Sequence, residues 1–292
     1  MNSRFPCGGA LFVAWVAFGL CAPARASDSI PVGPTPDITG PRTLGLASTI
    51  GTASGNEGLF VNPAAIAARK RYCIELGGLL DRRDAQNVGE VVNVSIVDGI
   101  STPITAGLAW NKIPDGTNEG TVSMLALAGP LGQGFFIGAS GKWFKLNGPT
   151  SKLERITVDA GLFWQASEYV SIGIAGYNLV PTGDPVVAPK QVGGGLAIGT
   201  DRLVQVTAEW TSDLDASPKT LNRYAAGVEG LLARQFPVRI GFVRDERLDA
   251  RWWSVGAGAV QPRFGVDIGY RQGIDDPKAR VLSASVKLYF LE

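Results

Sequence analysis

Strict alternation of apolar and polar residues dominates the chain from Tyr72 onward. In the segment that starts near Glu154, apolar residues take every second position from Ile156 to Trp164, and Phe163 alone breaks the second face. Successive side chains of a strand point to opposite faces, so this pattern predicts strands with one apolar and one polar face. Fourteen such segments start near Tyr72, Gly89, Pro103, Thr121, Gly134, Glu154, Tyr169, Gln191, Leu203, Asn222, Phe236, Arg251, Arg263 and Arg280.

The connections between these segments alternate in length. After even-numbered segments they are short, as at residues 98–99 and 166–167, whereas after most odd-numbered segments they are longer and polar, as at residues 81–88 and 181–190. Transmembrane barrels have short periplasmic turns and longer external loops. Most segments are about ten residues long, as a tilted strand needs to cross a bilayer. Residues 71–292 therefore predict an all-β fold, a closed 14-stranded antiparallel transmembrane β-barrel.

Aromatic residues on the apolar face sort to the two ends of the predicted strands. Those beside the long connections are Trp110, Trp143, Trp210, Tyr224, Trp253 and Tyr270, and those beside the short ones are Tyr72, Trp164, Phe236, Phe264 and Phe290. Two such girdles mark the two membrane interfaces of a barrel. A soluble β-sandwich is the alternative fold, because it also explains the alternation, but it gives no reason for aromatics to gather at strand ends on one face.

Residues 1–26 have the features of an export signal. Arg4 supplies a positive charge, residues 10–20 form an apolar run, and Ala24 and Ala26 frame a small-residue cleavage site. The run is shorter than the roughly 17–25 apolar residues of a membrane-spanning helix. We therefore expect a signal peptide that is cleaved after Ala26, and export to the bacterial outer membrane.

Residues 27–70 lack the strand pattern and are rich in Pro, Gly and small polar residues. Near their end, Asn62 and Pro63 have the features of the cap and first position of a short helix. A 14-stranded barrel lies between the filled interior of eight-stranded barrels and the aqueous channel of sixteen-stranded ones. Many inward positions are Gly, Ala or Ser, so we expect residues 27–70 to occupy the lumen as an N-terminal plug.

The inward face of the predicted strands carries charges of both signs. They are Glu75, Lys142, Arg155, Asp159, Glu209, Arg223, Glu229, Arg239, Asp267, Arg271 and Lys287. On the lipid face an Arg or Lys near the midplane costs roughly 2–4 kcal/mol, which is the reason to place these residues in the lumen. Two interpretations follow, a polar pathway for solutes and a network of ion pairs that holds the wall and the plug together. We favour the second.

The composition argues against catalysis. The chain has no histidine, which removes the usual general base, the usual zinc ligand and every His-dependent nucleophile. Cys73 is the single cysteine after the export signal, which excludes an intrachain disulfide. The net charge of +1 gives no indication of a nucleic-acid partner. We expect no catalytic residue, no metal site, no cofactor and no enzyme activity.

The stretch from Leu44 to Ala64 resembles the segment that leads into the first strand of FadL-type and PorV-type outer-membrane proteins. It combines Leu44-Gly45-Leu46-Ala47-Ser48 with an Asn62-Pro63-Ala64 turn. The resemblance implies a fourteen-stranded barrel with a lumenal hatch. Its FadL branch implies uptake of hydrophobic molecules, and its PorV branch implies a role in secretion or surface attachment of other proteins.

Two functions follow from this resemblance. The first is an outer-membrane channel for small hydrophobic molecules, with a plug that gates the lumen through Gly58, Leu59, Phe60, Asn62, Pro63 and Ala64. The second is a non-transporting scaffold whose partner is a secretion or surface protein. In both, outer-membrane lipid surrounds the barrel.

Overall fold

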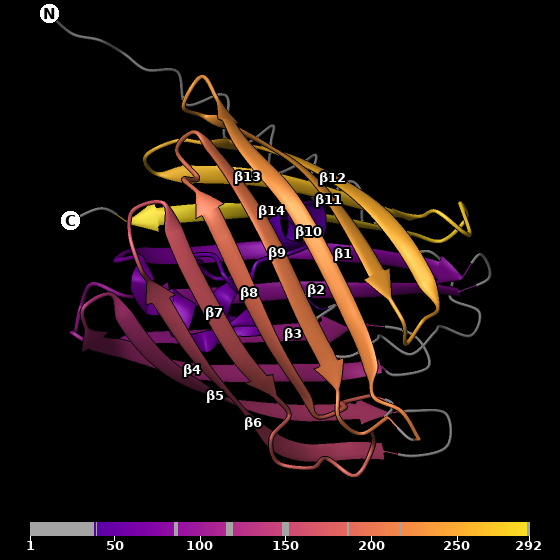
Figure 1. The fold of residues 1–292 in the computed structure, drawn as a ribbon. Helices are drawn as coiled ribbons and strands as arrows, with labels where there is room; N and C mark the ends of the chain where they lie inside the picture. The colour runs from indigo at the N-terminus through magenta and orange to yellow at the C-terminus, as the bar shows by residue number, and fades with distance from the viewer. Residues whose placement is uncertain are drawn as a thin grey trace, which may run out of the picture.

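The structure is a computed structural model that describes residues 38, 40–84, 87–114, 119–147, 152–185, 187–216 and 218–290. The predicted signal peptide and most of the first part of the predicted plug lie outside these residues. Fourteen antiparallel strands close into a barrel, in which β1 pairs with both β2 and β14 (Figure 1). The predicted fold is confirmed.

Every strand pairs with its neighbours in sequence, as expected when short turns join antiparallel strands. The observed first residues all lie within two positions of the predicted starts. The strands are β1 (Tyr72–Asp84), β2 (Asn87–Asp98), β3 (Thr105–Ile113), β4 (Glu119–Gly132), β5 (Phe135–Asn147), β6 (Lys152–Gln165), β7 (Val170–Tyr177), β8 (Gln191–Gly199), β9 (Val204–Asp213), β10 (Leu221–Leu232), β11 (Phe236–Asp245), β12 (Ala250–Val260), β13 (Phe264–Gly273) and β14 (Arg280–Phe290).

The connections on either side of β2 differ from the prediction. The predicted long loop over residues 81–88 is largely strand, because β1 continues to Asp84 and β2 begins at Asn87. The predicted tight turn at residues 98–99 is instead a longer connection between Asp98 and Thr105. There the Asp98 carboxylate accepts hydrogen bonds from the amides of Ile100 and Ser101, at 3.1 and 3.0 Å. These bonds hold the turn where strand pairing has ended.

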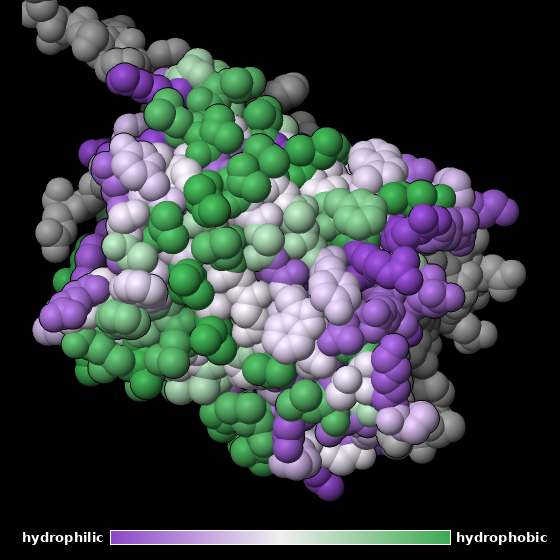
Figure 2. Space-filling view, in the orientation of Figure 1, coloured by the Kyte–Doolittle hydropathy of each residue, from purple (hydrophilic) through white to green (hydrophobic). Residues whose placement is uncertain are grey.

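The wall separates an apolar outer face from a largely polar inner face. Large apolar side chains such as Leu127, Ile156 and Ile240 are about half exposed or more on the outside. The predicted girdle residues, Trp143 and Phe236 among them, point outward as well. Figure 2 shows apolar side chains spread over much of the wall, with hydrophilic ones gathered toward the right-hand end. In a transmembrane barrel this outer face contacts lipid.

Residues 40–70, called the plug below, lie inside the barrel (Figure 1). They form helix α2 (Pro41–Leu46), the single turn α3 (Gly58–Val61) and the 3-10 helix η2 (Pro63–Ala68). As predicted, Asn62 caps the last of these, since its Oδ1 accepts from the Ala64 amide at 3.1 Å. Across the part of the chain that the structure describes, no helix has the length and apolarity to cross a membrane.

Candidate functional site in the barrel lumen

Glycines on the inner face bring the plug backbone directly against the wall. A Cβ atom at Gly138 would lie 2.6 Å from the Ala64 nitrogen, and one at Gly195 would lie 2.6 Å from the Gly51 nitrogen. Real Cβ atoms do not approach other atoms this closely, so both positions require glycine, which has no Cβ. Four pairs of inner-face glycines that lie against the plug stand opposite one another on neighbouring strands, namely Gly138 and Gly161, Gly173 and Gly195, Gly227 and Gly241, and Gly256 and Gly269.

The plug meets these four glycine pairs in order around the barrel. Pro41 lies against β13, the chain near Leu46 lies against β10 and β11, Ile50 lies against β7 and β8, and Pro63 lies against β5. The plug therefore follows the inner wall for more than half of its circumference before the chain leaves the lumen and enters β1.

Apolar side chains fill the space between the plug and strands β2 to β5. Leu59, Phe60 and Ile66 of the plug are buried and share one cluster with wall residues such as Met124 and Phe144. These wall side chains lie on the inner face, so this part of the lumen is largely apolar. We call this region the apolar side of the lumen. A smaller apolar cluster elsewhere in the lumen consists of Ala47, Ala225, Val243, Trp252 and Ala279.

Phe163 accounts for the one break in the alternation of β6. Its side chain points inward, is 1% exposed and packs on Ala64 and Ala65 of the plug. Phe136 on the neighbouring strand lies beside it, with ring centroids 6.1 Å apart. The apolar residue on the polar face is therefore a contact site for η2.

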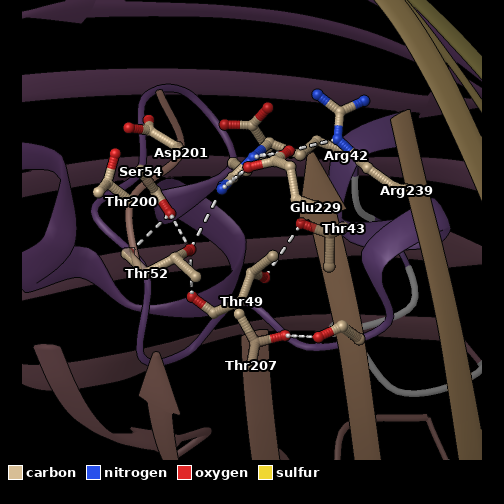
Figure 3. A network of polar contacts seen from close by, with 12 residues as sticks. Arg42, Thr43, Thr49, Thr52, Ser54, Thr200, Asp201, Thr207, Glu229 and Arg239 are labelled. Atoms are coloured by element: carbon tan, nitrogen blue, oxygen red, sulfur yellow. Dashed lines mark hydrogen bonds and ion pairs between the residues drawn. The ribbon is translucent and has the colours of Figure 1, made fainter. Parts of the chain in front are cut away.

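Ion pairs tie the opposite part of the plug to the wall. Arg42 donates to both carboxylate oxygens of Glu229, at 2.8 and 3.0 Å, and also to the Thr52 hydroxyl at 3.3 Å (Figure 3). Lys287 of β14 lies 2.5 Å from the Glu57 carboxylate. All four ionic side chains are buried. Burial raises the pKa of Glu57, but Lys287 and Arg42 outweigh it, and the pKa lies well below its usual value.

The wall charges continue the same network. Arg239 bridges Glu229 at 2.5 Å and Asp267 at 2.6 Å, and Lys287 reaches Asp267 at 3.1 Å and Glu75 at 3.7 Å. Each charge thus has opposite charges within ion-pair distance, which a buried ion requires to offset its lost hydration. We call this region the ionic side of the lumen.

Wall side chains also satisfy backbone groups of the plug. Glu209 accepts from the amides of Thr49 and Ile50 at 2.9 and 3.0 Å. The Tyr177 hydroxyl donates to the Val61 carbonyl at 2.5 Å, and Asn62 donates to the Leu162 carbonyl at 3.1 Å. Buried irregular backbone needs such partners, because neither a helix nor a sheet supplies them. These bonds fix the plug in one position.

The structure places all predicted gating residues in the lumen and buries them. Most of the predicted lumen charges belong to two networks. Lys287 joins Glu75 to Asp267, which Arg239 links to Glu229, and Lys142 pairs with Asp159 at 2.8 Å in the second network. The side chain of Arg155 is exposed near the start of β6, where it donates to the Glu154 carbonyl at 2.9 Å. The other inward charges comprise Glu209 and Arg223, both half-buried, and Arg271, which is buried.

The sequence analysis did not identify Arg42 and Glu57 as members of the ionic side. They are the only charged residues between positions 40 and 68. A charge that is enclosed inside a protein needs a partner of opposite sign. Isolated charges in the expected plug could therefore have indicated ion pairs with the wall. The sequence could not identify that partner, because Arg42 and Glu229 are 187 positions apart in the chain.

The connection after β7 corrects another expectation. Residues 181–190 were expected to form a polar external loop, but Thr182 and Ala188 are buried and Ala188 joins the apolar cluster. Asn178 turns the chain inward, with φ of 52°. Its amide donates to Asp159 at 2.8 Å and its side chain donates to the Pro189 carbonyl at 2.7 Å. This connection therefore covers the apolar side from the external end.

The lumen around the plug is closely filled. One cavity beside Phe60 and Glu75 and another beside Arg223 and Trp252 each measure about 20 Å³, enough for about one water molecule. Within the described ranges, no cluster of three or more His, Cys, Asp or Glu side chains could hold a metal ion. At these two places the plug leaves little space against the wall.

Sequence comparison with protein-family models and with curated proteins finds no match. Solved structures match the fold. The CymD monoaromatic hydrocarbon channel has a TM-score of 0.64 and 14% identity, and the match covers 90% of this chain and 99% of that chain. A FadL homologue of Pseudomonas aeruginosa has a TM-score of 0.63 and 13% identity, with coverage of 90% and 99%.

The Pseudomonas putida toluene transporter TodX has a TM-score of 0.57 and 10% identity, and the match covers 90% of this chain and 97% of that chain. At these identities the likeness is one of fold. The chain has the fold of the FadL-type outer-membrane barrels.

Proposed function

We propose that this protein is an outer-membrane channel for small hydrophobic molecules and that its plug gates the lumen. The observation that carries the proposal is the division of the lumen. On the apolar side, Leu59, Phe60 and Ile66 contact uncharged wall residues. A hydrophobic solute that passes here replaces apolar contacts between plug and wall with apolar contacts of its own. A route through the ionic side would instead separate buried charges, at a cost of about 3–5 kcal/mol per broken pair.

The fold comparison supports a hydrophobic solute. Proteins of this fold are named as a monoaromatic hydrocarbon channel and as toluene transporters. We extend that chemistry to this chain because uncharged side chains line the inner wall along β2 to β4. Lys142 on the next strand, β5, is paired with Asp159.

In the proposed mechanism, the plug is anchored by its charges and opens at residues 58–64. Arg42 and Glu57 hold the plug to β10 and β14. Beyond Glu57 no charged residue follows until Arg69, and the Leu59 side chain lies directly against Gly107 of β3. The described ion pairs beside these helices are those of Glu57 with Lys287 and of Arg69 with Asp201. A displacement of α3 and η2 would otherwise break dispersion contacts and a few hydrogen bonds.

Reconstitution of the mature chain into vesicles tests this function. We expect uptake of a monoaromatic hydrocarbon above that of empty vesicles, and we expect a variant that lacks residues 27–60 to show a larger conductance in planar bilayers. A charged solute of similar size serves as the control for selectivity. The proposal fails if the wild-type chain passes no hydrocarbon and the deletion leaves conductance unchanged.

The closely filled lumen also favours a second function, a non-transporting scaffold for a secretion or surface protein. A pull-down from outer membranes separates the two. A stoichiometric protein partner together with no solute flux would support the scaffold, and flux without such a partner would support the channel.

A further inference from the structure

An apolar groove on the outer face of the barrel is lined by β4 to β8 and by Pro103 and Ile104, which precede β3. Its volume is about 870 Å³. Its walls are large side chains that point outward, including Leu127, Ile137, Leu162 and Ile174, each about half exposed. Every residue that lines it is Pro, Ile, Leu, Val, Ala or Gly. The groove thus offers no charge and no side-chain hydrogen-bonding group.

The floor of the groove is a row of residues that lie opposite one another across five strands. Leu127 pairs with Ala139, Ala139 with Ala160, Ala160 with Gly176, and Gly176 with Val192. At about 4.8 Å per strand, the row extends roughly 19 Å. The strands of such barrels are tilted, so the row runs obliquely through the hydrocarbon layer and not along its surface.

The hollow forms because the wall is thin at this point. On β5 and β6 the inner face has the pair Gly138 and Gly161, against which the plug packs, and the outer face has the pair Ala139 and Ala160. The strands remain paired across the floor and the plug lies directly behind it, so the groove opens to the outside and is closed toward the lumen.

We propose that this groove binds a hydrocarbon chain of an outer-membrane lipid. The groove is continuous with the apolar outer face, which in a transmembrane barrel is the lipid interface. Its uncharged lining matches an acyl chain and excludes a headgroup, while a peptide would leave its backbone groups without partners there. The volume lies within the roughly 300–1,000 Å³ of ligand pockets, and an empty groove would deprive its walls of dispersion contacts.

The site is independent of the proposed channel function, because the wall and the plug separate the groove from the lumen. Loss of hydrocarbon flux would therefore leave this inference untouched, and loss of lipid binding would leave the channel untouched.

A pair of alanines elsewhere on the wall provides a matched control. Ala208 of β9 and Ala226 of β10 also point outward and also stand opposite one another, but they lie outside the groove. The double variant Ala139→Phe with Ala160→Phe fills the groove. The double variant Ala208→Phe with Ala226→Phe adds the same bulk to the wall without filling it.

The experiment reconstitutes the mature chain in phosphatidylethanolamine vesicles that contain a trace of phospholipid with a diazirine at the middle of one acyl chain. After irradiation, mass spectrometry maps the adducts. We expect several-fold more adducts on the groove walls than around Ala208 and Ala226. The groove-filling variant should lose this excess, and the control variant should keep it. A heat-modifiability gel verifies that both barrels fold, and the single variant Ala139→Leu replaces the double one if it does not.

Three results would overturn the inference. Adducts spread evenly around the wild-type barrel would show that the groove binds lipid no better than the rest of the outer face does. An excess that survives in the filled groove would show that the groove is not its cause. A dimer in native mass spectrometry, with the groove walls free of adducts, would show that a second copy of the chain covers the groove.

Discussion

Replacing Glu229 with Gln should loosen the plug, because it leaves Arg42 without its carboxylate partner. Removing one member of a buried ion pair costs about 3–5 kcal/mol. Asp267 still pairs with Arg239 in this variant, so we take the lower end, about 3 kcal/mol. At about 1.4 kcal/mol per factor of ten, the displaced population of the plug should rise by roughly a hundredfold.

Single-channel recording in planar bilayers measures this population as the frequency of conductance bursts. Asp275→Asn is the matched control, since it removes a carboxylate from the exposed pair with Arg251, and exposed pairs contribute about 1 kcal/mol or less. Adding Arg42→Met to Glu229→Gln removes the orphaned charge, so the double variant should behave more like the wild type than Glu229→Gln alone. Equal burst frequencies in Glu229→Gln and the control, or a double variant worse than the single one, would refute this reasoning.

Three further predictions concern the wall. Gly173→Ala should displace the plug and expose it to added protease, because the new methyl group meets the Ile50 carbonyl. The control Gly141→Ala should leave the plug protected, because there is open space around Gly141. Equal protease resistance of the two variants would contradict the close fit of the plug. Phe163→Ala should lower the free energy of unfolding in urea by about 3–5 kcal/mol, and a loss below 1 kcal/mol would show that the ring does not support η2. Ile240→Arg places a charge on the outer face and should cost roughly 2–4 kcal/mol for the barrel folded in vesicles, whereas Ile240→Leu should cost little; equal stability of the two would argue that this face does not contact lipid.

The barrel was predictable because each strand faces two different environments. The alternation of apolar and polar residues follows from this difference at each position of a strand. It therefore predicted every strand start within two positions of the observed one. The connections were less accurate where side chains hold the chain, as Asp98 does in the turn after β2.

The site was predictable only in outline. Inward glycines such as Gly173 and Gly195 look like ordinary small residues in the sequence, and their meaning appears only once the register sets them opposite one another. The inward course of residues 178–190 depends on Asp159, which lies on another strand. Phe163 was visible as an exception, but its partners Ala64 and Ala65 belong to a segment without a periodic pattern.

The position of the plug before β1 constrains how the molecule assembles. β1 must find β14, about two hundred positions away in the chain, while residues 40–70 already lie in the interior that this pairing encloses. Closure around an absent or misplaced plug would leave bare backbone at the glycine pairs, and it would deprive Glu229 of Arg42 and Lys287 of Glu57. Defects in the plug should therefore slow the closure of the barrel during biogenesis, in addition to changing permeation.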